Sequence, residues 1–257
     1  ISDHKVATKV NPRVTGKLNR ESINQQVEES LNRLQLEHIH TLYIHFPDNT
    51  TELAETLGAL NDLYLKGKFT RLGISNYSAW KAVQIIHTCK ENNWITPSVY
   101  QGLYNPLSRL VEMELIPALR EYGLSFYAYN PLAGGILSGK YNSFQDSTVD
   151  GRFTVRPNYK ERYWNEKLFK LVDDIKSVSN RNNSSIIEST FKWLNFNSIL
   201  SENDGILLGV SSEKQLKTNL SILSMGPLSN KIVQIFEECW DEIKSSCPSY
   251  FRGVDKK

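Results

Sequence analysis

The feature of this sequence that most constrains its fold is a regular alternation of short apolar runs with longer stretches of helical spacing. The short runs are rich in β-branched and aromatic residues, as strands are. Six strands are predicted: Lys5–Val10, Thr41–Phe46, Arg71–Ser75, Ser98–Leu103, Leu124–Tyr129 and Ile206–Val210. Strands that are each followed by a helix indicate a parallel sheet with right-handed crossovers. The alternation alone does not decide between an open sheet and a closed barrel.

The stretches between the strands place apolar residues on one helical face. Glu21–Leu34 and Glu52–Leu65 show this pattern most clearly. Further helices are predicted at Ser78–Asn92, Val111–Tyr122, Ser184–Trp193, Gln215–Ser224 and Asn230–Ser246. Three of the helices are followed by Gly67, Asn93 and Gly123, residue types that end helices in a left-handed conformation.

Composition argues against several classes of partner. No apolar run approaches the roughly 18 residues that cross a bilayer, so we expect a soluble protein. The formal net charge is only +2 and Lys and Arg are scattered, which argues against a nucleic-acid partner. Cys89, Cys239 and Cys247 suit neither a disulfide framework nor a zinc site, so we expect a reducing, cytoplasmic compartment and no metal. The chain starts with Ile1 rather than Met, and we expect it to be cut at its front.

Polar side chains gather where the predicted strands end. In a closed barrel these ends share one rim, on which the active sites of barrel enzymes assemble. The side chains are Lys9, His45, Asp48, Ser75, Asn76, Gln101, Asn105, Asn130, Ser211 and Ser212. Each also has a structural interpretation: His45 can be a satisfied core histidine, and Ser75 and Asn76 can cap the following helix.

Two strand-to-helix connections suit an anion. The stretch Pro131–Lys160 is rich in glycine and is predicted to be a long functional loop. Gly134 and Gly135 would let backbone amides approach a phosphate, although a tight turn explains them equally well. Ser211–Ser212 precede a helix, which suits an anion or a simple N-cap. Neither segment has the G-x-G-x-x-G or Walker spacing, which argues against a Rossmann or P-loop site.

Taken in order, six segments resemble the aldo-keto reductases over essentially the whole chain. They are Ala7–Lys9, Leu42–His45, Leu72–Tyr77, Val99–Gln101, Tyr127–Leu132 and Gly209–Ser212. The segments Tyr104–Asn105, Tyr129–Lys140, Gly151–Phe153 and Cys247–Arg252 look most like the aflatoxin-aldehyde reductase subgroup, which includes succinic semialdehyde reductases. The resemblance implies a TIM (β/α)8 barrel, of which residues 1–257 form a single, N-terminally incomplete domain covering about strands 3 to 8.

The same resemblance implies NADPH as cofactor. Ser75, Asn76 and Gln101 match the positions that hold the nicotinamide carboxamide, and Tyr129 matches the ring that stacks on the nicotinamide. The positions that match the loop over the pyrophosphate are Asn130, Pro131, Leu132, Gly134, Gly135, Leu137, Gly139 and Lys140. Those near the 2′-phosphate and adenine are Arg152, Ser211, Gln215 and Asn219. Many relatives carry Arg where Gln215 stands, so Lys140 and Arg152 are the expected phosphate-binding cations.

For catalysis the resemblance implies a Tyr that protonates the carbonyl, a Lys and an Asp that tune this Tyr, and a His that orients the substrate. Lys9 and His45 match the Lys and the His. The Tyr and the Asp are expected before Ile1, so residues 1–257 alone are expected to be inactive. Tyr43 shares a strand face with His45 but would point deeper, which makes it a poor substitute acid.

The implied substrate is a small aldehyde of the aflatoxin dialdehyde or succinic semialdehyde type. Tyr159, Arg162 and Arg252 match positions that hold the acidic end of such substrates. Each arginine also has an interpretation without a role in binding: Arg162 can be a solvated surface residue, and Arg252 stands close to a chain end.

The leading hypothesis is therefore an NADPH-dependent aldehyde reductase. The alternative is a non-catalytic NADPH-binding barrel that acts as a regulatory module, as in the β subunits of potassium channels. A barrel enzyme with another cofactor is a third hypothesis. The sequence leaves open whether two copies form a homodimer.

Overall fold

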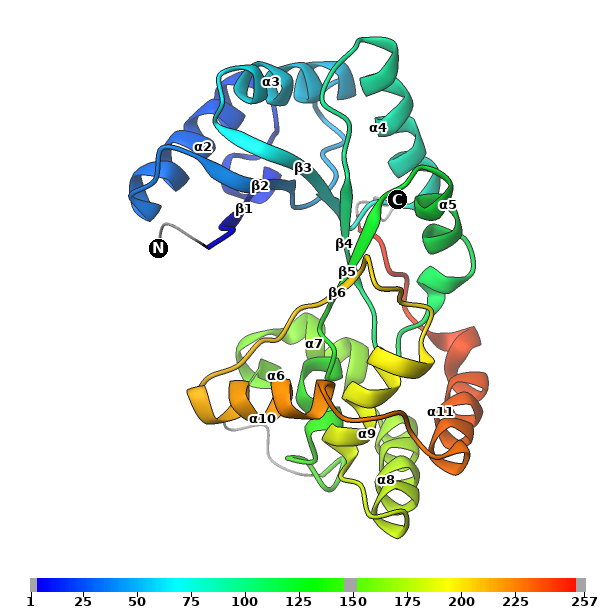
Figure 1. Cartoon of the computed structure of the whole chain (residues 1–257). Helices are drawn as coiled ribbons and strands as arrows, with labels where there is room; N and C mark the ends of the chain where they lie inside the picture. Colours follow the sequence, from blue (N-terminus) through cyan, green and yellow to red (C-terminus); the bar gives the residue numbers. More distant parts are fainter. Residues whose placement is uncertain (1–3, 146–151, 253–257) are drawn as a thin grey trace. The chain divides into compact units, whose positions relative to one another are not determined.

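The structure, a computed structural model, describes residues 4–145 and 152–252, without the side chain of Arg152. It contains one six-stranded sheet with the strand order β1-β2-β3-β4-β5-β6 (Figure 1). The strands are β1 (Ala7–Val10), β2 (Ile39–Ile44), β3 (Phe69–Ser75), β4 (Val99–Leu103), β5 (Ser125–Tyr129) and β6 (Gly205–Ile206). Strands β1 to β4 pair in parallel. The predicted α/β fold with a parallel sheet of six strands is confirmed.

Helices alternate with the strands. The α-helices are α1 (Pro12–Thr15), α2 (Arg20–Leu34), α3 (Leu53–Leu65), α4 (Ala79–Glu91), α5 (Leu115–Glu121), α6 (Arg152–Val155), α7 (Pro157–Tyr163), α8 (Glu166–Arg181), α9 (Ile186–Lys192), α10 (Glu213–Leu223) and α11 (Asn230–Ile243). Short 3₁₀ turns form η1 (Leu110–Glu112), η2 (Ala133–Ser138) and η4 (Lys244–Ser246), and η3 (Trp193–Asn197) is a π-helix. Gly67, Asn93 and Gly123 have φ values of 69°, 55° and 70°, so the predicted left-handed helix ends are confirmed.

Three predictions of local structure were wrong in part. The predicted strand Ile206–Val210 is only the two-residue β6, and Val210 is exposed, because the apolar run that follows β6 is not buried in a sheet. The predicted helix Val111–Tyr122 is divided into η1 and α5. The predicted loop Pro131–Lys160 contains η2, α6 and the first residues of α7.

Helix α8, the longest in the described residues, was not predicted from the sequence. Its N-cap is Asn165, whose side-chain oxygen accepts a hydrogen bond from the backbone N–H of Leu168 at 3.0 Å. One face of the helix is apolar and buried: Leu168, Phe169, Leu171, Val172 and Ile175. Both signals were present in the sequence.

The chain divides into two compact units, and each is described by itself. Unit 1 consists of residues 1–102, 113–127 and 249–257, and unit 2 of residues 103–112 and 128–248. Unit 1 contains β1 to β3, most of β4 and helices α1 to α5, whereas unit 2 contains β6 and helices α6 to α11. The single barrel domain expected from the sequence stays a prediction.

In unit 1, strand register places the apolar residues of neighbouring strands in rows. Leu42 pairs with Leu72, and Ile44 pairs with Ile74, which pairs in turn with Tyr100. All of these side chains are buried. Helices α2, α3 and α4 lie on the same side of β1 to β3 (Figure 1) and contribute buried Ile23, Val27, Leu57, Leu60, Ile85 and Ile86.

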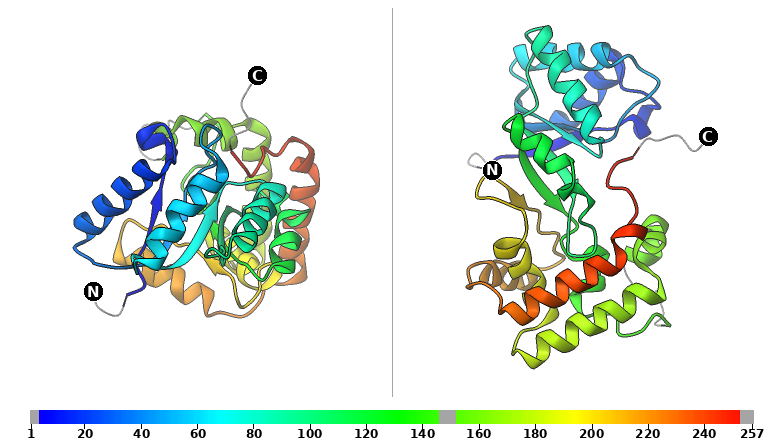
Figure 2. Two further views of the ribbon diagram at one scale, coloured as in Figure 1. Left: turned by 90° about the horizontal axis from the view of Figure 1, so that it is seen from above. Right: turned by 90° about the vertical axis from the view of Figure 1, so that its right-hand side faces the viewer.

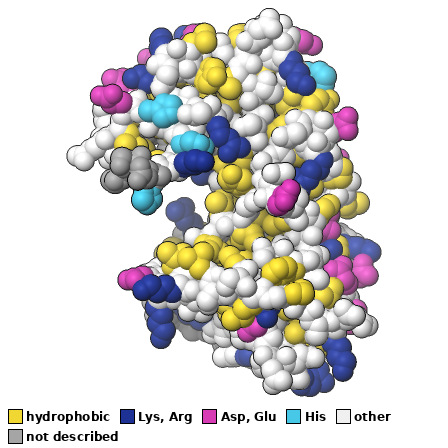
Figure 3. Space-filling view, in the orientation of Figure 1, with side chains coloured by type: hydrophobic (Ala, Val, Ile, Leu, Met, Phe, Trp, Pro, Cys, Tyr) yellow, Lys and Arg dark blue, Asp and Glu magenta, His cyan; other side chains and the backbone are white. Residues whose placement is uncertain are grey.

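In unit 2, helices α8 and α11 pack side by side (Figure 2). A charged network links η1 to α11: the Arg109 guanidinium donates to both oxygens of Glu112 at 2.9 and 3.1 Å and to both oxygens of Glu237 at 2.9 and 2.8 Å. The same guanidinium lies over the ring of Trp193. Within the described residues no helix is both long enough and apolar enough to cross a membrane. Figure 3 shows Lys and Arg at separate places on the face in view, with Asp and Glu among them.

Candidate active site

Strand register brings several predicted site residues to one face of the sheet in unit 1. Lys9 pairs with Tyr43, which pairs with Gly73. Two residues further along the strands, Ser75 pairs with Gln101, and the backbone N–H of His45 donates to the carbonyl of Val10 at 2.9 Å. Side chains two residues apart on a strand share a face. Therefore Lys9, Tyr43, His45, Ser75 and Gln101 lie on one face, opposite the helices, with Ser75 at the carboxyl end of β3 and His45 directly after β2.

The environment of this face keeps His45 neutral. Burial, followed by the charges of Lys9 and Arg13, lowers the pKa of His45 to about 4. Burial also lowers the pKa of the Lys9 ammonium, which lies 5.2 Å from the centre of the Tyr43 ring. At neutral pH His45 is therefore an uncharged imidazole, with an N–H that can donate a hydrogen bond. Perturbed groups clustered in this way are typical of functional sites.

Tyr43 lies on the same face two residues before His45, and so within β2 rather than beyond its carboxyl end, as predicted. A Cβ atom on Gly73 would come within 2.4 Å of the Tyr43 ring, so the glycine is what leaves room for it. The side chain of Gln101 forms a hydrogen bond with Tyr43, and burial raises the pKa of Tyr43 to about 12. A phenol with so high a pKa is a weak acid, which agrees with the expectation that Tyr43 is a poor proton donor.

Asn76 joins the ends of β2 and β3. Its side-chain amide donates to the carbonyl of His45 at 2.8 Å and to the hydroxyl of Ser75 at 2.9 Å. Its backbone φ is 64°, a left-handed conformation that Asn tolerates better than most residues. The interpretation of Ser75 and Asn76 as helix caps was wrong, because Ser78 occupies the N-cap position of α4.

In unit 2, the segment after β5 is held by a buried polar cluster. The hydroxyl of Tyr163 receives hydrogen bonds from the amides of Asn105 at 3.2 Å and Asn130 at 3.0 Å, and it pairs with the Ser108 hydroxyl at 3.1 Å. The Asn105 amide also donates to the carbonyl of Asn130 at 3.0 Å. Sequence reasoning missed Tyr163, since no local pattern marks its role.

The glycines after Asn130 form a tight turn. Gly134, Gly135 and Gly139 have φ values of 74°, 110° and 76°. The N–H of Gly134 donates to the Asn130 side chain at 2.6 Å, and that of Gly135 donates to the carbonyl of Leu132 at 2.8 Å. These two amides are therefore engaged within the turn. A Cβ atom on Gly134 would lie 2.9 Å from the ring of Tyr159, so this glycine permits close packing of α7.

The other residues predicted to bind the nucleotide near this turn differ in their exposure to solvent. Leu137 is buried, and Pro131 is buried beside the half-buried Leu132. Tyr129, at the end of β5, is also half-buried. The exposed Lys140 places its ammonium 5.5 Å from the centre of the Tyr141 ring. The Arg152 side chain lies outside the described residues.

Helix α10 positions three further predicted residues. Ser212 is its N-cap, and its hydroxyl accepts from the N–H of Gln215 at 3.2 Å, so the N-cap interpretation of this serine is confirmed. The Ser211 N–H and hydroxyl donate to the Gln215 side chain at 2.9 and 3.1 Å. Asn219, on the same helix, is only 5% exposed.

The predicted substrate residues occur in both units. In unit 2, Arg162 is half-buried, and its guanidinium donates to the carbonyl of Pro248 at 3.1 Å. In unit 1, the backbone N–H of Arg252 donates to the carbonyl of Asn76 at 2.9 Å, so the segment around Arg252 is hydrogen-bonded to the residue that follows β3. Cys89, Cys239 and Cys247 are free thiols. No group of three His, Cys, Asp or Glu side chains in residues 4–145 and 152–252 could hold a metal ion.

Comparison with known proteins identifies the family. A sequence model of the aldo/keto reductase family matches residues 2–241. The chain belongs to this family. It is therefore an oxidoreductase, and aldo-keto reductases use the nicotinamide nucleotides NAD(P)H. It is 40% identical to aflatoxin B1 aldehyde reductase member 2 of Rattus norvegicus over 260 residues, which cover 96% of this chain and 71% of the relative.

Two human relatives are similarly close. Aldo-keto reductase family 7 member A3 of Homo sapiens is 41% identical over 260 residues, covering 96% of this chain and 78% of the relative. Aflatoxin B1 aldehyde reductase member 4 of Homo sapiens is 40% identical over 261 residues, again covering 96% of this chain and 78% of the relative. The resemblance to the aldo-keto reductases is thus confirmed at the level of the family.

Proposed function

We propose that this aldo-keto reductase uses NADPH to reduce small aldehydes to alcohols, with Lys9 and His45 in its catalytic site. The observation that carries the proposal is the shared sheet face of Lys9, His45, Ser75 and Gln101 in unit 1. The names of the relatives, which include aflatoxin B1 aldehyde reductases, support an aldehyde as substrate.

The chemistry of His45 and Lys9 suits a carbonyl reduction. Because its pKa is lowered to about 4, His45 stays neutral and can donate a hydrogen bond to the carbonyl oxygen of an aldehyde. The half-buried Lys9 ammonium supplies positive charge where negative charge develops on that oxygen. The two groups therefore polarise the carbonyl without transferring the proton themselves.

The polar groups available in the chain fit a nicotinamide nucleotide. When bound, the nucleotide supplies the hydride that reduces the carbonyl. The Ser75 hydroxyl and the Gln101 amide offer both donors and acceptors, as a carboxamide requires. The amide N–H groups of Asn76 already donate to His45 and Ser75, so its assignment to the carboxamide rests on the family resemblance. In unit 2, the family resemblance assigns Asn219, which is 5% exposed, to the adenine end of the nucleotide.

The further nucleotide-binding residues are assigned by the family resemblance. We assign Tyr129 to the nicotinamide ring, the turn from Asn130 to Lys140 to the pyrophosphate, and Arg152 to the 2′-phosphate. Ser211 and Gln215 are assigned to the same end of the nucleotide as Asn219. Since Gln215 accepts hydrogen bonds from Ser211, its contribution to a phosphate is one of position rather than charge.

The proposal is tested first by nucleotide binding. Titration of residues 1–257 with NADPH, followed by the fluorescence of the nucleotide, should show saturable binding that Gln101→Ala weakens. Glu29→Gln, an exposed change on α2, should leave binding unchanged. An absence of saturable binding would contradict the proposal and favour an enzyme with another cofactor.

The second test concerns turnover. Tyr43 has a pKa of about 12 and is engaged with Gln101, so residues 1–257 should not reduce 4-nitrobenzaldehyde at a measurable steady rate. Steady reduction by this polypeptide would show that the acid lies within residues 1–257. Nucleotide binding without turnover even in a longer protein that contains this chain would favour a regulatory NADPH-binding module.

A further inference from the structure

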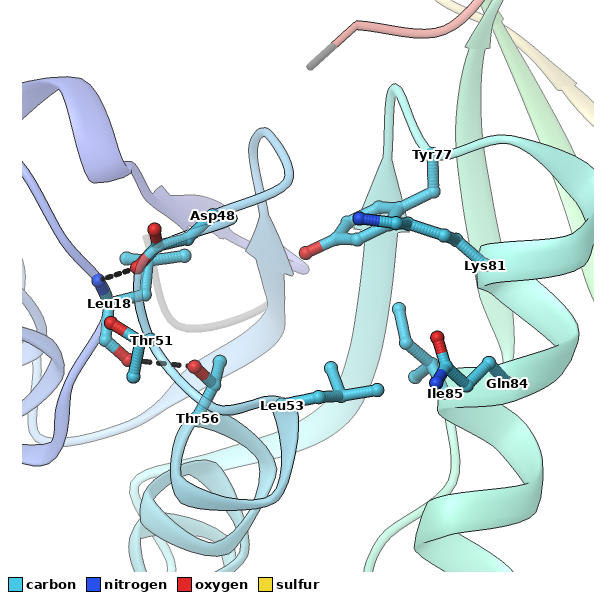
Figure 4. Close-up of a pocket in the computed structure, with 9 residues that line it drawn as sticks. All are labelled: Leu18, Asp48, Thr51, Leu53, Thr56, Tyr77, Lys81, Gln84 and Ile85. Atoms are coloured by element: carbon cyan, nitrogen blue, oxygen red, sulfur yellow. Dashed lines mark hydrogen bonds between the residues drawn. The ribbon is translucent and has the colours of Figure 1, made fainter. Parts of the chain in front are cut away.

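A small pocket in unit 1 is built from residues outside the candidate active site (Figure 4). It lies among the segments that follow β2 and β3 and the helices α3 and α4. Its lining is formed by Leu18, Asp48, Thr51, Leu53, Thr56, Tyr77, Lys81, Gln84 and Ile85. The volume open to the centres of water-sized spheres is about 50 Å³, and one water molecule needs about 10–15 Å³ of such space. An occupant therefore has only a few non-hydrogen atoms.

One polar group, on a side chain that is otherwise largely buried, faces this pocket. Tyr77 is 4% exposed, and Figure 4 shows its hydroxyl directed into the space between Asp48 and Leu53. No residue that the structure describes forms a hydrogen bond with this hydroxyl. Burial, and then the charge of Asp48, raise the pKa of Tyr77 far above its usual value, so the group remains a phenol that can donate.

Asp48 is already bonded to other donors. Its oxygens accept the N–H of Leu18 at 2.6 Å and the N–H and hydroxyl of Thr50 at 2.8 and 2.7 Å. Burial alone would raise the pKa of Asp48, but these hydrogen bonds lower it, so the group is charged.

The charges around the pocket favour a neutral occupant. An anion would meet the carboxylate of Asp48, whereas a cation would meet the ammonium of Lys81. Leu53 and Ile85 form an apolar surface on the side of the pocket away from Asp48 (Figure 4). The pocket thus combines a hydrogen-bond donor with a short aliphatic surface.

We propose that this pocket binds a small neutral molecule whose carbonyl or hydroxyl oxygen accepts a hydrogen bond from Tyr77 and whose short aliphatic part packs on Leu53 and Ile85. The lining contains neither Lys9 and His45 nor any residue proposed to bind the nucleotide. It does not depend on the proposed reductase activity, and its test requires no turnover.

The test is a titration of residues 1–257 with acetone and with propan-1-ol, followed by NMR of the methyl groups of Leu53 and Ile85. Saturable shifts of both methyl groups are expected. Acetone offers only an acceptor, so binding of acetone identifies a carbonyl ligand as sufficient, whereas binding of propan-1-ol alone identifies a hydroxyl ligand. Either result supports a neutral oxygen ligand.

The variant Tyr77→Phe removes only the hydroxyl and should weaken binding about 2- to 10-fold, the effect of one hydrogen bond. The matched control is Tyr122→Phe in the same unit, because the exposed Tyr122 hydroxyl already bonds to His87 at 2.8 Å. This control should bind both probes as the unaltered chain does. Equal affinity in Tyr77→Phe would overturn the proposal.

A second comparison needs no variant. Acetate and isopropylammonium are similar in size to acetone but charged, and both should shift the two methyl groups less than acetone does at equal concentration. Stronger binding of either ion, or shifts that rise linearly without saturation, would overturn the proposal even if Tyr77→Phe failed to fold.

Discussion

The backbone N–H of Arg252 donates a hydrogen bond to the carbonyl oxygen of Asn76, with 2.9 Å between the two atoms. Two residues earlier, Tyr250 is 7% exposed, and its hydroxyl accepts the N–H of Ala79 at 3.1 Å and donates to Glu114 at 2.7 Å. Ala79 is the first residue of α4, where backbone N–H groups lack partners within the helix. This segment therefore completes the start of α4 and holds the residue that follows β3.

Removal of the Tyr250 hydroxyl should destabilise unit 1. Tyr250→Phe leaves the Ala79 N–H and the Glu114 carboxylate without their partner, which should lower the free energy of unfolding by about 1–3 kcal/mol. Urea denaturation measures the change. Tyr122→Phe, which removes an exposed hydroxyl, should change the free energy by no more than about 0.5 kcal/mol. Equal effects of the two variants would show that the buried hydrogen bonds of Tyr250 do not contribute to the free energy of unfolding.

His45 should make stability depend on pH. Its pKa is about 4 in the native state and about 6.5 in an unfolded chain. Between these values the unfolded state binds a proton that the native state does not, so stability should fall as the pH falls from about 6.5 to 4. His45→Gln should flatten this part of the curve, as measured by the urea midpoint at several pH values.

The control for this pH profile is His87→Gln, a change at an exposed histidine of the same unit. It should leave the slope between pH 6.5 and 4 as in the unaltered chain. A slope that His45→Gln does not change would mean that other groups cause the acid sensitivity.

Local patterns predict much of this fold because strands and helices differ in period. The same periodicity, combined with strand register, accounts for why Lys9, His45 and Ser75 share a face. It fails where tertiary contacts decide, as in the apolar run after β6, which is apolar enough for a strand but lies largely exposed. Helix α8 is a different case, because the sequence contains both its N-cap residue and its apolar face, and the helix could have been predicted from them.

The polar cluster around Tyr163 could not be predicted from any local pattern. Its members come from the segment after β4, the end of β5 and helix α7, and the tyrosine itself looks like an ordinary core residue. Only the folded chain brings together Asn105, Ser108 and Asn130, separated from Tyr163 by 58, 55 and 33 positions.

Tyr163 should therefore be essential to unit 2 through its hydroxyl. Tyr163→Phe leaves three buried polar side chains without this partner and should lower the free energy of unfolding by about 1–3 kcal/mol for each one that finds no substitute. Tyr159→Phe, on the same helix but half-buried, should cost less. Denaturant unfolding distinguishes the two, and a neutral Tyr163→Phe would contradict the importance of the cluster.

Arg152 should select NADPH over NADH. If its guanidinium binds the 2′-phosphate, Arg152→Ala should weaken NADPH by roughly 1.5–3 kcal/mol, the range for hydrogen bonds to charged groups, and leave NADH almost unchanged. Fluorescence titration with both nucleotides measures the difference. Arg33→Ala, an exposed change on α2, is the control. Equal losses for NADPH and NADH would reject this assignment.

The last prediction separates the two arginines proposed for the acidic end of the substrate. A guanidinium binds a carboxylate with two parallel hydrogen bonds, so loss of Arg252 should raise the KM for succinic semialdehyde strongly and leave that for 4-nitrobenzaldehyde almost unchanged. The measurement requires an active preparation that contains this chain. Arg252→Ala keeps the backbone N–H that bonds to Asn76, so a specific effect on the charged substrate cannot come from loss of that contact.

Arg162 differs because its side chain also donates to the carbonyl of Pro248. Arg162→Ala should therefore raise the KM for succinic semialdehyde and also lower the urea midpoint, whereas Arg162→Lys, which keeps a donor and the charge, should restore the midpoint more fully than the KM. A parallel loss on charged and uncharged aldehydes for both Arg162→Ala and Arg252→Ala would mean that the two residues maintain local structure, and the carboxylate-binding role would have to be abandoned.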